Sequence, residues 1–354
     1  MLFILDGHAL AYRHYFAQSR NQLATSSGEP TGAIYGFART LLDILIQDKP
    51  TYLVVAFDEG MSGRDTLYPA YKGTREKMPE DLALQMRRIR QLVETFNIPI
   101  LAQEGYEADD LMGTVAQQAA AQGIDVRIIT GDRDLLQLLD EHVTARLAIP
   151  VAGKDDEIYD VARFREKWGF EPRQLIDYKA MVGDTSDNIP GVSGIGDKGA
   201  TALIQQFGSL DAIYANIDQL AAGVQKKLEA GRDSAYLSYQ LATIHTDLNV
   251  TFDAQACIAH DFDDRKVRAL FEELQFRTLI KQLNTLKPPE AGEALLAESD
   301  GSDLQAAHEV IRTVIVDDEP TLRELVETLN AAEAIAFDTE TTGIDQTTAQ
   351  LVGL

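Results

Sequence analysis

The stretch Leu53-Val54-Val55-Ala56-Phe57-Asp58 is a short apolar run that ends on an aspartate, and two other stretches of the chain have the same form. Phe3-Ile4-Leu5 comes directly before Asp6, and the run from Val126 to Gly131 comes directly before Asp132. Short apolar runs before a break are typical of buried parallel strands. Because groups past the carboxyl ends of such strands line the crevice where ligands bind, we expect these aspartates to converge there.

Further acidic side chains follow in three short motifs: Glu107-Ala108-Asp109-Asp110 at the start of a helical pattern, Asp134 close after Asp132, and Gly183-Asp184-Thr185-Ser186-Asp187-Asn188. Carboxylates packed closely together raise one another's pKa, so a cluster without cations would be costly. Hard oxygen ligands favour Mg²⁺ or Mn²⁺ over Zn²⁺, and two such ions close together can cleave a phosphodiester. The candidate metal ligands are Asp6, Asp58, Glu107, Asp109, Asp110, Asp132, Asp134, Asp184 and Asp187.

The composition is that of a globular protein, and 354 residues suffice for two or more domains. Cys257 is the only cysteine, so an intrachain disulfide is excluded and a reducing cytoplasmic location is expected. The first apolar run, Leu2 to Leu5, is too short for the core of a signal peptide. No apolar stretch is long enough to span a membrane.

The net charge of −24 is unevenly distributed along the chain. Residues 291–354 carry 14 acidic against 2 basic side chains, whereas Ser62 to Arg90 carry seven basic against four acidic ones, interleaved with Tyr68 and Tyr71. We therefore expect local basic patches to allow nucleic-acid binding in spite of the overall charge. The seven basic residues are Arg64, Lys72, Arg75, Lys77, Arg87, Arg88 and Arg90.

Strand-like and helix-like segments alternate over the first 150 residues, which predicts an α/β fold with a mostly parallel sheet flanked by helices. Residues 60–80 interrupt this alternation with glycines and prolines among basic and aromatic side chains. They predict a long functional loop or a mobile helical arch. The predicted strands lie near 2–5, 51–57 and 125–130, and the predicted helices near 32–47, 80–96 and 107–122.

From about residue 161 to 286 amphipathic helices dominate. A glycine-rich turn at 191–199 opens a helix that we expect to end near Phe207. Because backbone amides at such a turn can approach a phosphate, we expect it to hold the backbone of duplex DNA. The predicted DNA contacts in this turn are Gly191, Val192, Gly194, Ile195, Gly196, Lys198 and Gly199.

Four parts of the chain are expected. Residues 1–160 form the α/β core, with the arch at about 60–80, and residues 161–286 form a helical DNA-binding region. The proline-containing, acidic segment 287–308 is typical of a linker. Residues 309–354 begin a further module that is incomplete, with strands at 311–316 and 334–337 and a helix at 320–329.

These motifs strongly resemble the 5′ nuclease domain of bacterial DNA polymerase I, a relative of the flap endonucleases, over roughly residues 1–285. The most specific pieces are Tyr68-Pro-Ala-Tyr-Lys72-Gly-Thr-Arg75, Gly105-Tyr-Glu107-Ala-Asp109-Asp110, Thr130-Gly-Asp132-Arg-Asp134-Leu, and Gly183-Asp184-Thr-Ser-Asp187-Asn followed by Ile-Pro-Gly-Val-Ser-Gly-Ile-Gly. The resemblance implies a PIN-like core with an arch. It also implies a helix-three-turn-helix that binds DNA and holds K⁺ at the 191–199 turn, with Lys198 near a phosphate.

The tail from about residue 310 resembles the opening of the 3′-5′ exonuclease domain of that polymerase, with Asp338 and Glu340 at its first acidic pair. The later acids of that domain are missing, as is everything that would form a polymerase. This resemblance implies an amino-terminal fragment of a longer protein. It further implies a role in primer removal and DNA repair, with RNA primers left open as targets and a monomer expected.

We expect two ions to activate water and stabilise charge on a phosphodiester of nicked, branched or flapped DNA, which leaves a 5′-phosphate and a 3′-hydroxyl. Lys72 and Arg75 are expected at the scissile phosphate. The predicted ligands are Asp6, Asp58, Glu107 and Asp109 for the first ion and Asp109, Asp132, Asp134 and Asp187 for the second, with Asp110 and Asp184 holding waters.

Three further residues are predicted to contact DNA. Tyr68 and Tyr71 could stack on bases, as aromatic residues do in single-strand sites. Arg64 stands in Gly63-Arg64-Asp65, where the family usually has an aromatic residue, Arg and His. We expect Arg64 to grip the substrate.

Each of these residues also has an ordinary structural explanation. A single aspartate can cap a helix or a turn, and Asp184 and Asp187 fit an Asx turn. Lys72 and Arg75 could belong to a solvated face, and core packing explains Tyr71 nearly as well as base stacking does. The glycine-rich turn could be a helix C-cap followed by an N-cap.

Two rival functions stay open. A catalytically idle module that binds structured DNA would keep the arch and the glycine-rich turn but would lose metal-binding acids, and none is lost here. A metal-dependent RNase on a related fold would use fewer acids and would generally lack the glycine-rich duplex clamp. The helical region at 161–285 therefore favours a DNA nuclease.

Overall fold

The computed structural model describes residues 1–18, 23–147 and 156–286, with a few isolated positions after residue 320. The chain divides into one compact unit, Met1–Lys287, and a second, Pro288–Leu354. In the second unit the described strands β7 (Glu340–Thr341) and β8 (Leu351–Gly353) pair antiparallel. The predicted linker and most of the predicted exonuclease-like segment, including Asp338, lie outside the described residues.

A six-stranded sheet in the order β3-β2-β1-β4-β5-β6 forms the centre of the first unit. Strand β1 pairs in parallel with both of its neighbours, so that Leu5 lies opposite Val55 on one side and Ile129 on the other. The pairs β2–β3 and β4–β5 are also parallel, and only the edge pair β5–β6 is antiparallel. This confirms the predicted mostly parallel sheet. Its strands are β1 (Leu2–Asp6), β2 (Tyr52–Ala56), β3 (Ile100–Leu101), β4 (Val126–Thr130), β5 (Val143–Leu147) and β6 (Glu157–Tyr159).

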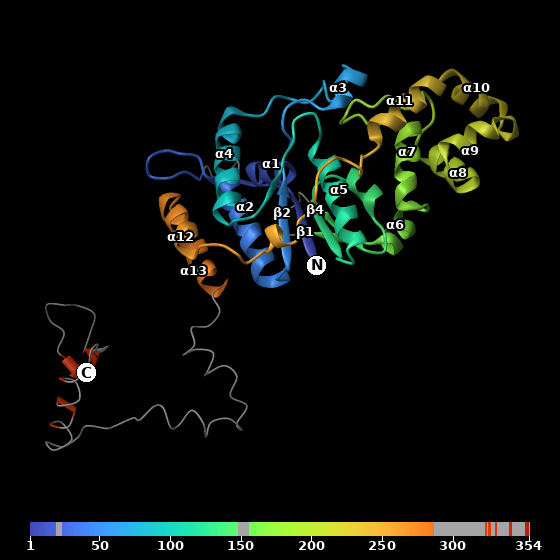
Figure 1. Cartoon of the computed structure of the whole chain (residues 1–354). Helices are drawn as coiled ribbons and strands as arrows, with labels where there is room; N and C mark the ends of the chain where they lie inside the picture. Colours follow the sequence, from blue (N-terminus) through green and yellow to red (C-terminus); the bar gives the residue numbers. More distant parts are fainter. Residues whose placement is uncertain are drawn as a thin grey trace, which may run out of the picture. The chain divides into compact units, whose positions relative to one another are not determined.

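Helices cover both faces of this sheet: α1, α2 and α4 lie on one side of β1 and β2, and α5 lies on the other (Figure 1). The predicted helices at 32–47, 80–96 and 107–122 are all present, and the first of them finishes in a π-helical turn, Ile44–Asp48. The core helices are α1 (Gly7–Gln18), α2 (Gly32–Asp43), α3 (Gly63–Leu67), α4 (Glu80–Thr95) and α5 (Ala108–Ala121).

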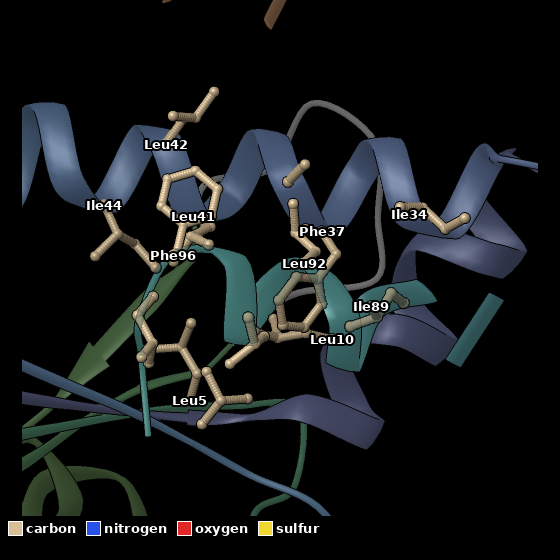
Figure 2. Close-up of a cluster of buried hydrophobic side chains, with 14 of the residues drawn as sticks. Leu5, Leu10, Ile34, Phe37, Leu41, Leu42, Ile44, Ile89, Leu92 and Phe96 are labelled. Carbon is tan, nitrogen blue, oxygen red and sulfur yellow. The ribbon is translucent and has the colours of Figure 1, made fainter. Parts of the chain in front are cut away.

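The two faces of β1 belong to two different apolar cores. Phe3 and Leu5 pack with residues of α2 and α4, whereas Leu2 and Ile4 pack with residues of α5. Figure 2 shows the first of these cores, in which Leu5 lies beside apolar side chains of α2 and α4. Because both faces are buried, the strand must be apolar at every position, which explains its uninterrupted apolar run.

Residues 161–286 are helical, as predicted, and helices α6 to α11 share a further apolar core with side chains of β5 and β6. Helices α12 and α13 instead pack against α2 and α4 of the α/β core. The chain returns to that core through Ala259, whose N–H donates to the carbonyl oxygen of Thr51 at 3.0 Å. The helices are α6 (Val161–Trp168), α7 (Leu175–Val182), α8 (Asp197–Phe207), α9 (Leu210–Ala215), α10 (Ala222–Ala230), α11 (Arg232–Ala242), α12 (Asp264–Glu273) and α13 (Arg277–Leu283).

The predicted arch at 60–80 contains the short helix α3, and turns and bends connect it to α4. The predicted helix after the glycine-rich turn is α8, which ends at Phe207 as expected. Within the described ranges, no helix combines the length and the apolar character that crossing a membrane would require.

Candidate functional site

Three strands direct their terminal aspartates into one cavity. Asp6 ends β1, Asp58 lies two residues past β2, and Asp132 lies two residues past β4. All three line a cavity of about 560 Å³, as predicted from the parallel sheet. We call it the acidic cavity; its lining residues are Asp6, His8, Ala9, Tyr12, Asp58, Lys72, Arg75, Met78, Ala108, Asp109, Gly131, Asp132 and Ser186.

The carboxylate of Asp6 is held in a fixed orientation by two hydrogen bonds. Its Oδ1 accepts from the N–H of Ala9 at 2.9 Å, and its Oδ2 accepts from the hydroxyl of Thr130 at 2.8 Å. Burial raises the pKa of Asp6 to about 6 although both hydrogen bonds lower it, and the charges of Asp58 and Asp132 contribute to the rise. The cavity therefore disfavours the ionised form of Asp6 unless a cation compensates it.

The start of α5 contacts Asp58 and brings one further carboxylate, Asp109, to this cavity. The N–H of Ala108 donates to Oδ1 of Asp58 at 2.8 Å, which ties the end of β2 to the helix. Asp109, in the first turn, has a pKa raised well above its ordinary value by burial and by the charges of Asp132 and Asp6. These carboxylates face one another across the cavity, and their mutual repulsion is what a divalent cation would relieve.

Glu107, directly before α5, points toward the arch. Its Oε1 accepts from the hydroxyl of Ser62 at 3.0 Å. Its Oε2 accepts from Nζ of Lys72 at 2.9 Å and from the hydroxyl of Tyr71 at 3.3 Å. Burial lowers the pKa of Lys72, but the charges of Glu107 and Asp187 raise it more, so the ammonium is retained.

Asp187 forms a second contact with the arch. Arg75 donates to Oδ1 of Asp187 at 2.5 Å, and the backbone N–H of Lys72 donates to the carbonyl oxygen of Asp187 at 2.9 Å. Lys72 has φ 52°, a left-handed conformation that is uncommon outside glycine and asparagine. The surrounding contacts thus impose an unusual backbone at a candidate catalytic lysine.

Asp134 and Asp184 share one lysine. The ammonium of Lys179, on α7, contacts Asp134 and lies 2.6 Å from Oδ2 of Asp184. Burial and the charge of Asp132 raise the pKa of Asp134 to about 7. Burial alone would also raise the pKa of Asp184, but hydrogen bonds from Lys179 and Ser186 hold it at about 2. Lys179 is not among the residues predicted from the sequence; its position in the last turn of a helix, five residues before Asp184, is the signal that could have found it.

A closed loop presents Asp184 and Asp187. The N–H of Asp184 donates to the carbonyl oxygen of Ile189 at 2.9 Å, and the N–H of Ile189 donates back at 2.7 Å. Gly183 and Gly191 have φ values of 78° and 63°, and their backbones pack on each other. A Cβ at Gly183 would lie 2.5 Å from the oxygen of Ile189, so only glycine fits there.

Arg64 and Asp110 form a buried ion pair outside the acidic cavity. They are 7% and 1% exposed, and the guanidinium binds both carboxylate oxygens at 2.7 and 2.8 Å. Arg64 also donates to the carbonyl oxygens of Leu241 and Thr243, at the end of α11, at 3.1 and 2.5 Å. Contrary to the predicted DNA contact, Arg64 is engaged in the interior, where it joins the arch, α5 and α11.

The two tyrosines of the arch are also turned inward. Tyr71 is 5% exposed and packs with Ile176, Ile189 and Leu241, so base stacking is not available to it. Core packing, the alternative reading of Tyr71, is what the structure shows. Tyr68 is half-buried against the same cluster.

The glycine-rich turn exposes its backbone and buries two of its side chains. Val192 and Ile195 belong to the apolar core of the helical region, so their side chains do not face solvent as DNA contacts would. Gly194 and Gly196 are exposed, as are Lys198 and Gly199 in the first turn of α8. The N–H of Gly191 donates to the hydroxyl of Ser238 on α11 at 2.9 Å.

Basic side chains already neutralise some of the predicted metal ligands. Within residues 1–18, 23–147 and 156–286, no three Asp, Glu, His or Cys side chains surround one point as a complete metal site does. Three of these carboxylates bind basic side chains instead: Glu107 binds Lys72, Asp187 binds Arg75, and Asp134 binds Lys179. The carboxylates that line the cavity, Asp6, Asp58, Asp109 and Asp132, offer hard oxygen donors, and such donors fit a divalent cation.

Two family models match the chain: "5′-3′ exonuclease, N-terminal resolvase-like domain" over residues 1–169 and "5′-3′ exonuclease, C-terminal SAM fold" over residues 170–265. DNA polymerase I of Chloroflexus aurantiacus is 43% identical over 376 aligned residues, which cover 100% of this chain and 40% of the relative. DNA polymerase I of Pseudomonas aeruginosa is 38% identical and is matched over 100% of this chain and 38% of its own length. The chain thus spans about two fifths of the length of these relatives.

Solved structures share the fold. A T5 5′-exonuclease with bound divalent metal ions (zinc) superposes with a TM-score of 0.57 at 23% identity, covering 81% of this chain and 99% of that one. The catalytic core of Rad2 in complex with DNA substrate superposes with a TM-score of 0.55 at 17% identity, covering 81% and 92%. The fold is therefore the PIN-like 5′ nuclease core followed by a SAM-like helical region. Through residues 1–265, this chain belongs to the 5′-3′ exonuclease family.

Proposed function

We propose that this chain hydrolyses phosphodiesters near the 5′ end or flap of nicked or branched DNA. The observation that carries this proposal is the acidic cavity, where carboxylates from three strand ends and α5 face Lys72 and Arg75 of the arch. The carboxylates can hold cations, and the basic side chains can receive the negative charge of a phosphate. The family membership of residues 1–265 supports the same reaction.

Divalent ions held in this cavity would supply an activated water and positive charge for the phosphate. The backbone N–H groups of Ala9 and Ala108 and the hydroxyl of Thr130 orient the carboxylates that face the cavity. Mg²⁺ or Mn²⁺ is our choice because all the donors are hard oxygens. We assign Asp6, Asp58, Glu107 and Asp109 to the first ion and Asp109, Asp132, Asp134 and Asp187 to the second.

In this proposal Asp110 and Asp184 do not bind a metal ion directly but hold nearby metal-binding carboxylates in place. Asp110 accepts from the N–H of Glu107 at 3.4 Å and binds Arg64, so it fixes the turn that carries Glu107. Asp184 binds Lys179 and closes the loop that carries Asp187. Both roles orient metal-binding carboxylates.

Lys72 and Arg75 have to change partners during this reaction. Each now binds a carboxylate, Glu107 or Asp187, that we assign to a metal ion. An incoming phosphate would compete for both basic side chains while cations compensate the released carboxylates. The positive charge of Lys72 and Arg75 then stabilises the negative charge that develops on the phosphate in the transition state.

The duplex on one side of the cleavage point would lie on the helical region. The exposed backbone around Gly194 and Gly196 precedes α8, whose amino-terminal N–H groups suit a phosphate. The T5 D15 flap endonuclease is described in a pseudo-enzyme-product complex with DNA and metal ions. The biological setting we propose is a cytoplasmic monomer that acts in primer removal and DNA repair, with RNA primers among its targets, as the amino-terminal part of a polymerase I.

Cleavage of a 5′-labelled flap on nicked duplex, with Mg²⁺ or with a chelator, tests this function. Wild type is expected to release the flap only with Mg²⁺, whereas Asp132→Ala should bind the flap but cleave about 100-fold more slowly or worse. Asp247→Ala, at an exposed carboxylate outside the cavity, should behave as wild type.

Other outcomes separate the alternatives. If Asp132→Ala cleaves normally at saturating Mg²⁺, the metal assignment is wrong. Binding without cleavage by wild type would support an idle DNA-binding module. Cleavage of a matched RNA flap with no cleavage of the DNA flap would support the RNase alternative.

A further inference from the structure

A lysine from α10 crosses the glycine-rich turn. Nζ of Lys227 donates to the carbonyl oxygen of Gly194 at 2.9 Å. Gly194 has φ 81°, and a Cβ on it would lie 3.1 Å from Cε of Lys227 and 3.3 Å from its Nζ. The missing side chain at Gly194 therefore leaves the space in which the lysine stem lies.

This contact occupies the turn at which the family resemblance implies K⁺. A potassium ion is bound by several carbonyl oxygens that replace its hydration shell. Here the carbonyls of Gly191, Val192 and Gly196 accept hydrogen bonds from protein groups at 2.6 to 3.0 Å, and that of Gly194 accepts from an ammonium. The turn thus already holds a positive charge, and that charge is part of the chain.

We propose that Lys227 takes the place of a K⁺ ion at this turn and binds a phosphate of duplex DNA there, without a requirement for K⁺. The inference rests on the proposed function, in which the turn holds the DNA backbone. An ammonium has three N–H donors, and the bond to Gly194 uses one of them. The others can reach a phosphate, because Lys227 is exposed at the surface that carries the turn.

The neighbouring residue supplies a matched control. Lys226 has the same charge, lies on the same helix and is also exposed. Successive helical residues point in directions about 100° apart, so Lys226 and Lys227 do not share a face. A general effect of positive charge on DNA binding would appear in both variants, whereas an effect specific to the turn would appear only at Lys227.

The test measures duplex affinity by fluorescence anisotropy in EDTA, which prevents cleavage, for wild type, Lys227→Met and Lys226→Met in matched KCl and NaCl. Wild type should bind equally well in both salts, within about twofold. Lys227→Met should bind about 3- to 10-fold more weakly in NaCl, with a salt slope reduced by about 1. Lys226→Met should change affinity by less than about twofold.

Partial rescue of Lys227→Met by KCl but not by NaCl would further support the idea that the ammonium takes the place of an ion. Two results would overturn the inference: wild type that binds several-fold better in KCl, or a Lys227→Met variant that matches Lys226→Met. Melting temperatures of both variants show whether they are folded. Failure of wild type both to bind duplex and to cleave flaps would instead contradict the proposed function.

Discussion

The ammonium of Lys72 lies 2.9 Å from Oε2 of Glu107, so a side chain expected at the scissile phosphate binds a carboxylate expected at a metal ion. Arg75 and Asp187 repeat this relationship on the same wall. These pairs neutralise the acids without a metal. We therefore expect that a metal ion displaces the basic side chain from its carboxylate when cations and substrate bind. The released basic side chain then binds the phosphate.

Replacing Lys72 by Met should have opposite effects on metal binding and on catalysis. Because the competing ammonium is gone, half-saturation with Mg²⁺ should occur at a lower concentration. The single-turnover cleavage rate should fall by about 100-fold, because charge on the phosphate loses a partner in the transition state. Lys77→Met, at an exposed lysine of the same segment, should change neither quantity. Weaker binding with an unchanged single-turnover rate would show that Lys72 only binds substrate.

Lys179 should matter most when no divalent ion is present. Its side chain is 12% exposed and neutralises Asp134 and Asp184 together. Lys179→Met should lower the free energy of unfolding by roughly 3 kcal/mol in EDTA, because a buried carboxylate loses its partner. With Mg²⁺ the loss should be smaller, since a cation can compensate Asp134.

Urea unfolding of Lys179→Met in both conditions measures that difference, with Lys266→Met, on the exposed side of α12, as the control. Equal destabilisation with and without Mg²⁺ would mean that no cation replaces the lysine at Asp134.

The pair of Arg64 and Asp110 should contribute to stability as a unit. Arg64→Met alone leaves a 1%-exposed carboxylate without its partner and should cost about 3 to 5 kcal/mol in urea unfolding. Arg64→Lys should not restore the loss, because an ammonium cannot form the bidentate contact. The double variant Arg64→Met, Asp110→Leu should recover much of the stability, and strictly additive losses would refute the coupling.

The strands that are buried on both faces and therefore continuously apolar could be predicted from the sequence. The strands without a continuous apolar run were missed. β1, β2 and β4 are buried on both faces and end at acids, which made them recognisable. β5 alternates with Thr144 and Arg146, and β3 has only two residues, too few for any pattern. Helix α1 was missed because it buries little besides Leu10 and Ala11.

Contacts between distant segments were beyond the sequence for a different reason. The burial of Arg64 depends on α5 and α11 meeting behind the arch, and the role of Lys179 depends on α7 lying beside Asp134. Residue type and spacing identify an acid at a strand end, because the sheet itself fixes its position. They cannot show which basic side chain folds back onto that acid.

His14, on α1, makes stability depend on pH away from the acidic cavity. Its Nε2 and the hydroxyl of Thr40 lie 2.9 Å apart in a hydrogen bond. Burial lowers the pKa of His14 to about 4, and the charge of Arg13 adds to the effect although Asp156 opposes it. The folded chain therefore remains unprotonated at His14 where the unfolded chain, with a pKa near 6.5, already binds a proton.

Stability should accordingly fall as the pH drops through 6.5 and should stop falling from this source near pH 4. His14→Gln retains a group that can hydrogen-bond to Thr40 and does not titrate. Between about pH 7.5 and pH 5, wild type should lose about 1 to 2 kcal/mol more than the variant in urea unfolding. Parallel pH profiles would show that His14 is protonated as readily in the folded chain as in the unfolded one, and its burial would then carry no cost.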